Sequence, residues 1–127
     1  MPTPEHLRAL RDRLLTLHKA LLDAERAAYE QAHGPVPSSG EMLQLVIGHE
    51  QFTWLRAYSG LIVNIDEWIA SDTRKADEPE ALWQEAKTLT ALGDTPDAVR
   101  YRTAVQASAS AAMAHAAVRD LLDADQA

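Results

Sequence analysis

Residues 7–34 read LRALRDRLLTLHKALLDAERAAYEQAHG, and this stretch decides the fold. Its apolar side chains recur at alternating steps of three and four residues: Leu7, Leu10, Leu14, Leu17, Leu21, Ala24 and Ala28. A spacing of about 3.5 residues predicts one long helix with a seam that packs against other helices. A second stripe widens the apolar face, as a helical bundle requires, at Leu15, Leu22 and Tyr29. Thr3 and Pro4 form a helix start, and Gly34 with Pro35 forms a stop.

Three more helices are expected after the Pro-, Gly- and Ser-rich loop at residues 34–40. The second begins near residue 39 and continues to about residue 70, and the third opens at Pro79. The fourth follows the start signal at residues 94–97 and runs to about residue 123. We therefore expect an all-α protein, an up-and-down four-helix bundle that forms a single domain over residues 1–127.

The second helix is expected to be broken near residues 48–51. An apolar block ends at Ile47, and a differently phased one begins at Phe52. Between the blocks lies Gly48, and glycine costs about 1 kcal/mol in a helix interior relative to alanine. Two interpretations remain open. The break either bends the helix around the core, or it frees backbone groups and presents polar side chains at a cleft.

The charge of the chain is acidic and unevenly distributed, with a net charge of −7. Residues 1–33 hold five basic and five acidic residues, so the excess negative charge lies in residues 34–127. The only basic cluster, at Arg8, Arg11 and Arg13, is diluted by acidic neighbours. A surface that binds phosphates needs clustered Lys and Arg, so we expect no nucleic-acid partner.

The cellular setting is inferred from what the chain lacks. It has no cysteine, which removes disulfides and thiolate chemistry and suits a reducing compartment. Residues 1–6 lack the apolar run of a secretory signal. The longest run without Asp, Glu, Lys or Arg, residues 103–118, is too short and too weakly apolar to span a bilayer. We expect a soluble, cytoplasmic protein with no membrane partner.

No motif in the chain specifies a reaction. A di-iron bundle needs Glu-x-x-His on two helices, and this chain has one copy, Glu30 to His33, at a helix end. His49-Glu50 lacks the second histidine of a zinc-protease helix, and there is no serine-nucleophile motif or Gly-rich phosphate loop. We therefore predict no catalytic residue, no metal site and no cofactor. The tryptophans at positions 54, 68 and 83 are interpreted as core and boundary residues.

Two segments resemble a small family of uncharacterised bacterial helical proteins: HKALLDAER at residues 18–26 and WLRAYSGLIVNIDE at residues 54–67. The likeness extends over roughly residues 15–70. It implies a bacterial, cytosolic source and carries no assigned activity.

Two functions remain open from the sequence. The first is a non-enzymatic interaction or regulatory module, expected to be a homodimer because the Ala- and Ser-rich stretch from Ala104 to Ala117 buries little area by itself. The second is a bundle that binds a small molecule, or an enzyme, with its pocket near the interruption at residues 48–58. The candidate ligand-binding residues there are His49, Glu50, Trp54, Arg56 and Tyr58. An aromatic-lined cavity with His49 or Arg56 at its mouth favours the second function, and a closed aliphatic interior favours the first.

Overall fold

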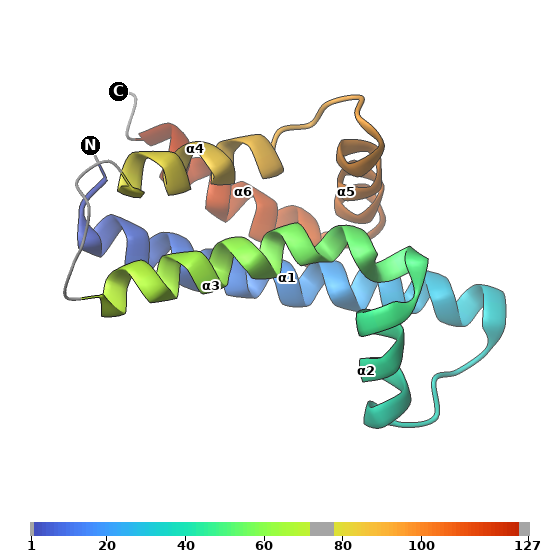
Figure 1. Cartoon of the computed structure of the whole chain (residues 1–127). Helices are drawn as coiled ribbons and strands as arrows, with labels where there is room; N and C mark the ends of the chain where they lie inside the picture. The colour runs from blue at the N-terminus through green and yellow to red at the C-terminus, as the bar shows by residue number, and fades with distance from the viewer. Residues whose placement is uncertain (1, 72–77, 125–127) are drawn as a thin grey trace.

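The computed structural model describes residues 2–71 and 78–124 of the chain. Within these ranges every regular element is helical, which confirms the all-α prediction. The α-helices are α1 (Pro4–His33), α2 (Ser39–Gly48), α3 (Arg56–Ala70), α4 (Glu78–Leu89), α5 (Pro96–Ala107) and α6 (Ala109–Ala124). A 3-10 helix, η1 (Glu50–Leu55), connects α2 to α3 (Figure 1). None of the described helices is both long enough and apolar enough to cross a membrane.

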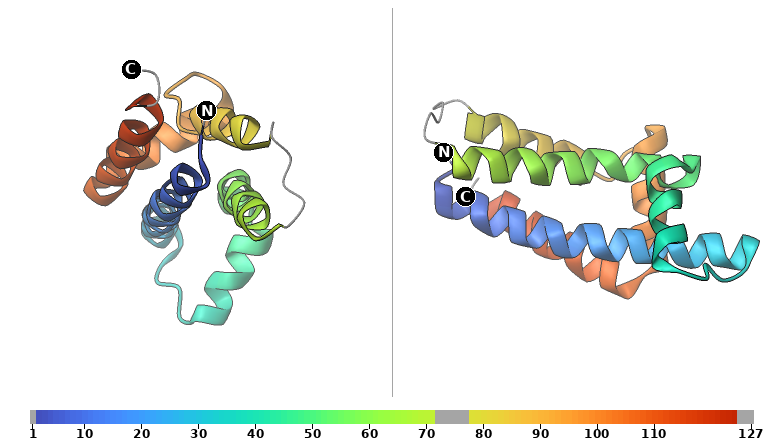
Figure 2. Two further views of the ribbon diagram at one scale, coloured as in Figure 1. Left: turned by 90° about the vertical axis from the view of Figure 1, so that its left-hand side faces the viewer. Right: turned by 60° about the horizontal axis from the view of Figure 1, so that its bottom comes forward.

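The predicted count of four helices is wrong, because the described residues form six α-helices. The expected second helix is divided at His49, whose backbone is extended (φ −82°, ψ 132°), so the predicted break is present. The expected fourth helix is also divided, at Ser108 (φ −136°, ψ 122°), and this break was not predicted. As a result α2 and α5 run across the direction of α1, while α1, α3, α4 and α6 run alternately in opposite directions (Figures 1 and 2).

The ends of α1 lie where the sequence places them. The Thr3 hydroxyl accepts a hydrogen bond from the His6 N–H (3.2 Å), and His6 Nδ1 accepts one from the Thr3 N–H (3.1 Å). At the other end Gly34 has a φ of +87°, a conformation that a side chain disfavours. These two caps enclose 30 residues, which makes α1 about 45 Å long at about 1.5 Å per residue.

The core lies along α1, which packs most extensively against α6 and α3. Five leucines of the α1 seam are no more than 1% exposed: Leu7, Leu10, Leu14, Leu17 and Leu21. The three tryptophans are buried, as predicted. The prediction that the second apolar stripe widens the buried face is wrong at Leu15. This side chain is 49% exposed, because no neighbouring helix covers that side of α1. Figure 2 shows α4 and α6 on one side of the α1–α3 pair and α2 on the opposite side.

The small side chains of α6 face α1. Ala111, Ala114, Val118 and Leu122 recur at helical spacing, and all are buried. Small side chains at these positions let the two backbones approach closely, so this stretch serves packing within one chain. Ser108 makes the turn before α6 possible, because its hydroxyl accepts a hydrogen bond from the Ala111 N–H (3.2 Å) and so caps the new helix.

Candidate functional site

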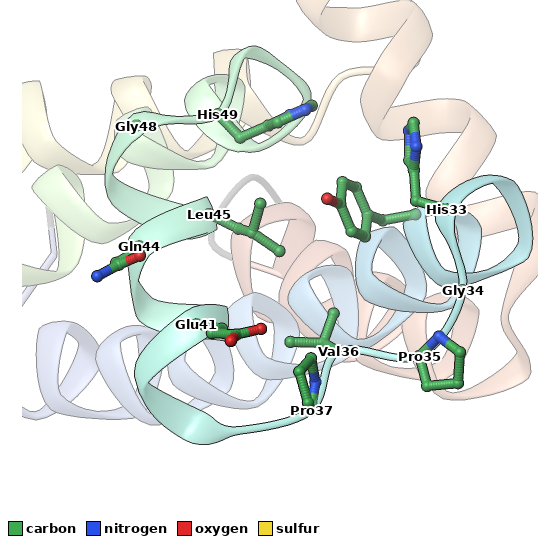
Figure 3. A pocket seen from close by; sticks show the side chains of 11 residues that line it. His33, Gly34, Pro35, Val36, Pro37, Glu41, Gln44, Leu45, Gly48 and His49 are labelled. Atoms are coloured by element: carbon green, nitrogen blue, oxygen red, sulfur yellow. The ribbon is translucent and has the colours of Figure 1, made fainter.

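A pocket of about 580 Å³ lies between the last turns of α1, the loop that follows, and α2 (Figure 3). Its size falls within the range of about 300–1,000 Å³ that is typical of small-molecule sites. Ring side chains, polar side chains and apolar side chains all line it: Tyr29, His33, His49, Glu41, Gln44, Val36 and Leu45. The pocket lies directly beside the helix break predicted from the sequence.

The loop wall of the pocket is tied to α1. Arg26 forms an ion pair with Glu30 one turn later, with 3.0 Å between Nε and Oε1. The second oxygen of Glu30 accepts a hydrogen bond from the Val36 N–H (3.0 Å), and Val36 is 9% exposed. The Ser38 hydroxyl then accepts the N–H of Glu41 (3.1 Å) and starts α2. The chain therefore turns back within a few residues and brings α2 alongside the end of α1.

Three rings meet in the pocket around Tyr29. Its ring centroid lies 4.5 Å from that of His33 and 5.3 Å from that of His49. The two histidine centroids are 6.5 Å apart, with their ring planes inclined by 66°. Phe52, fully buried, closes the cluster at 5.9 Å from Tyr29. Figure 3 shows His33 and His49 reaching the pocket from opposite sides.

His49 presents a hydrogen-bond donor. Its Nδ1 accepts a hydrogen bond from the Gln51 N–H (3.1 Å), which caps η1. A neutral imidazole that accepts at Nδ1 carries its proton on Nε2. That Nε2–H has no hydrogen-bond partner among residues 2–71 and 78–124. A nitrogen that carries a proton cannot coordinate a metal, so this geometry suits a ligand with an acceptor atom. In the same ranges no group of three or more His, Asp or Glu side chains is placed to hold a metal ion.

The structure does not bring the five candidate residues into one site. His49 lines the pocket. Glu50 does not, and lies instead in a separate shallow hollow of about 320 Å³ with Glu25 and Arg100, on the other side of His49. Arg56 is exposed and donates a hydrogen bond to the carbonyl of Ile47 at the end of α2. Positions 50 and 56 face outward because the tight turn of η1 directs other residues inward.

Trp54 and Tyr58 belong to the core. They are 5% and 3% exposed, and their rings meet edge to face at 5.7 Å. The Tyr58 hydroxyl donates to the carbonyl of Leu89 (2.7 Å), which joins α3 to the end of α4. Burial raises the pKa of Tyr58 well above its usual range. Both side chains therefore support the fold next to the break and do not reach the pocket.

The shallow hollow beside His49 contains a perturbed carboxyl group. Burial raises the pKa of Glu25, although a hydrogen bond with Gln51 and the charge of Arg100 act in the opposite direction. The Gln51 side chain also donates to the backbone carbonyl of Glu25 (3.4 Å), so η1 is joined to α1 at this point. These contacts fix the segment that carries His49.

The pocket contains residues that the sequence did not single out as ligand-binding: Tyr29, His33, Glu41 and Gln44. A local signal existed for two of them, because Tyr29 and His33 are four residues apart and share a helix face. Their convergence with α2 is a long-range contact that spacing along the chain does not reveal.

Comparison with known proteins gives no matching family, no similar curated protein and no similar solved structure. No role is therefore transferred to these residues from a relative. The resemblance of residues 15–70 to bacterial helical proteins is not tested by these comparisons and stays a prediction.

Proposed function

We propose that this chain is a regulatory module that binds a small aromatic amine, with a hydrogen-bond acceptor in or on its ring, in the pocket between α1 and α2. The observation that carries the proposal is the convergence of Tyr29, His33 and His49 on one pocket beside the helix break. An aromatic-lined pocket with His49 in its wall is the feature that favours a small-molecule site over a closed aliphatic interior.

The chemistry of the lining defines the ligand class. Three neighbouring rings favour an aromatic ligand, which packs against them edge to face or offset. The Nε2–H of His49 requires a ring acceptor, either a nitrogen or an oxygen. Figure 3 shows the Glu41 side chain directed into the pocket from α2, where its carboxylate favours an ammonium or another N–H donor.

A regulatory role is supported by the position of α2. This helix contributes no buried residue to the core, so it is held less firmly than the other helices. A ligand that contacts both α1 and α2 would add packing that α2 lacks by itself. Binding would then stabilise one position of α2, and no nucleophile or acid–base pair in the pocket is needed for that role.

The cellular setting proposed for this module is the bacterial cytoplasm. The resemblance of residues 15–70 to bacterial helical proteins and the lack of cysteine support this setting. Cell fractionation of the tagged full chain in its bacterial host tests it, and recovery in the periplasmic fraction would contradict it.

Saturation-transfer NMR with histamine and tyramine tests the binding function, because each joins a ring acceptor to an ammonium group. At about 1 mM probe, a concentration that detects weak binding, we expect signals with the wild-type chain. We expect them to be lost with His49→Ala and weakened with Glu41→Gln. The matched control is Gln31→Ala, an exposed α1 position two residues from His33 that does not line the pocket.

A second probe separates the two contacts. Pyridine retains the ring acceptor but has neither an ammonium nor an N–H, so its binding should depend on His49 and be insensitive to Glu41→Gln. The absence of binding by every probe, or equal binding by the wild-type and His49→Ala chains, overturns the proposal.

A further inference from the structure

A second, smaller cavity lies where the beginning of α3 meets the end of α4 and the first turn of α5 (Figure 1). Its volume is about 200 Å³, below the range of about 300–1,000 Å³ that is typical of sites for drug-sized ligands. The elements around it are joined, because the Tyr58 hydroxyl donates to the Leu89 carbonyl and the Tyr58 ring stacks on Tyr101 of α5. This cavity shares no lining residue with the pocket between α1 and α2.

The oxygen atoms of the cavity wall are mainly hydrogen-bond acceptors. The Tyr58 hydroxyl uses its proton on Leu89, and the Thr88 hydroxyl uses its proton on a carbonyl one turn earlier (3.1 Å), so both oxygens offer only lone pairs. Asp97 adds a carboxylate in the first turn of α5, where the partial positive charge of the helix end favours the ionised form. Only the Thr95 hydroxyl, whose oxygen caps α5, keeps a proton to donate. A ligand that satisfies this wall must therefore be chiefly a hydrogen-bond donor.

The wall also combines aromatic rings with one negative charge. Trp54 and Tyr58 line it and meet edge to face at 5.7 Å, and the face of such a ring attracts a cation. No Lys, Arg or His of the described ranges lines the cavity, and Asp97 forms no ion pair with any of those residues. Burial, and then the neighbouring Tyr101 and Asp97, raise the pKa of Tyr58, so the phenol stays neutral beside the carboxylate. Rings, acceptor oxygens and an unpaired carboxylate together suit a small cation that carries N–H groups.

We propose that this cavity binds a small primary alkylammonium ion. Its ammonium group carries three N–H donors for the oxygens of Asp97, Thr88 and Tyr58, and the bond to the carboxylate is the strongest because both partners are charged. Its short alkyl chain lies against Trp54 and Ala57. The small volume favours a free ion over an ammonium group that is attached to a lipid or a peptide.

NMR titration of the full chain with ethylammonium chloride tests the proposal. The indole N–H of Trp54 is buried and has no hydrogen-bond partner in the described ranges, so a cation bound beside this ring should shift its signal. The indole signals of Trp68 and Trp83, which do not line the cavity, should stay in place. An ion of so few atoms should bind with a dissociation constant of about 1 mM or weaker, so the titration extends to about 50 mM. Tetramethylammonium chloride has the same charge but no N–H, and should bind at least about fivefold more weakly.

Substitution of the carboxylate tests the site directly. Asp97→Asn should raise the dissociation constant for ethylammonium at least about fivefold, because a charge-assisted hydrogen bond is lost. The matched control is Asp94→Asn, which removes the same charge at a fully exposed position that does not line the cavity, and it should bind like the wild type. His49→Ala should also bind like the wild type, because His49 lines only the other pocket and its neighbouring hollow. The NMR spectrum of each variant without ligand verifies its fold.

Each arm has an outcome that contradicts the proposal. A Trp54 signal that does not move up to about 50 mM overturns it, and so does Asp97→Asn binding no more weakly than Asp94→Asn. Loss of the shift in His49→Ala also overturns it, because the ion would then bind in the pocket between α1 and α2. Equal binding of tetramethylammonium overturns the assignment to an N–H donor. Nα-acetyl-lysine methylamide carries the same ammonium on a peptide-like chain, and tighter binding of this compound than of ethylammonium overturns the assignment to a free ion.

Discussion

The protonation state of His115, on α6, depends on the residues around it in the folded chain. Its Nδ1 forms a hydrogen bond with the hydroxyl of Tyr101 (2.5 Å), and Tyr101 is fully buried. Tyr58 stacks on Tyr101 with 5.5 Å between ring centroids. Burial lowers the pKa of His115, and the charge of Arg119 lowers it further. Burial and the positive charge of Arg119 both disfavour the charged imidazolium, so the folded chain favours the neutral ring.

This environment predicts loss of stability in acid. Because the pKa of His115 is lowered from 6.5 in the folded chain, the unfolded chain binds more protons below that pH. The free energy of unfolding should therefore be fully retained above about pH 6.5 and fall as the pH drops through the folded pKa. Urea unfolding measures the free energy of unfolding of the wild type and of His115→Gln at about pH 7.5 and at about pH 5.5. The difference between the two pH values is then compared between the two chains.

We expect a smaller loss of stability on acidification in His115→Gln than in the wild type. The pKa of His18 is also lowered by burial, so a part of the acid loss should remain in that variant and disappear when His18→Gln is added. An identical pH dependence of the wild type and His115→Gln would contradict this account of the Tyr101–His115 contact.

At the scale of an element, the two helix breaks arise in different ways. The break at His49 follows a glycine and separates two apolar blocks, so the pattern along the chain indicates it. Gly48 itself is the last residue of α2 and has no positive φ, so the extended residue is His49. The break at Ser108 lies within alanine and serine, where intrinsic helix preference is nearly uniform. There the serine hydroxyl caps α6, and packing of α6 along α1 determines which serine does so.

Removal of this cap should destabilise the fold. Ser108→Ala deletes the acceptor for the Ala111 N–H and should lower the free energy of unfolding by about 0.5–2 kcal/mol, the usual value for a lost N-cap. Ser110→Ala is the matched control, because Ser110 is exposed within α6 and alanine is the better helix former there. Urea unfolding measures both variants. A loss of stability at Ser110 equal to that at Ser108 would show that the hydroxyl at position 108 has no special role.

At the scale of the whole molecule, stability decreases from the α1 seam toward α2. The five seam leucines (Leu7, Leu10, Leu14, Leu17 and Leu21) lie in the core between α6 and α3, whereas α2 has no buried residue and contacts mainly η1. Local opening requires less free energy where few apolar contacts are broken. The pocket therefore lies where α2, which has no buried residue, meets the last turns of α1, beyond the buried leucine seam.

Hydrogen–deuterium exchange measured by mass spectrometry should reveal this gradient. We expect peptides from residues 39–48 to exchange faster than those from any other α-helix, and peptides from residues 7–21 to exchange most slowly. Protection of α2 equal to that of residues 7–21 would contradict the gradient.

The sequence by itself determined the features that depend on neighbours along the chain. The all-helical content, both ends of α1, its leucine seam, the burial of the tryptophans and the break after Gly48 all follow from spacing, caps and turn residues. The same local signal singled out His49, which does line the pocket. It placed Trp54 and Tyr58 beside His49 only because they are near it in sequence.

Only the tertiary structure decided the features that depend on contacts between distant residues. Tyr29 and His33 meet His49 because the short loop after Gly34 turns α2 back on α1, and Ser108 interrupts a helix-prone stretch because α6 packs along α1. Periodicity states which face of a helix is apolar, but the length of α1 that each neighbour covers is set by packing in three dimensions. That coverage leaves Leu15, Leu43 and Ile47 exposed, although these side chains are as apolar as those of the core.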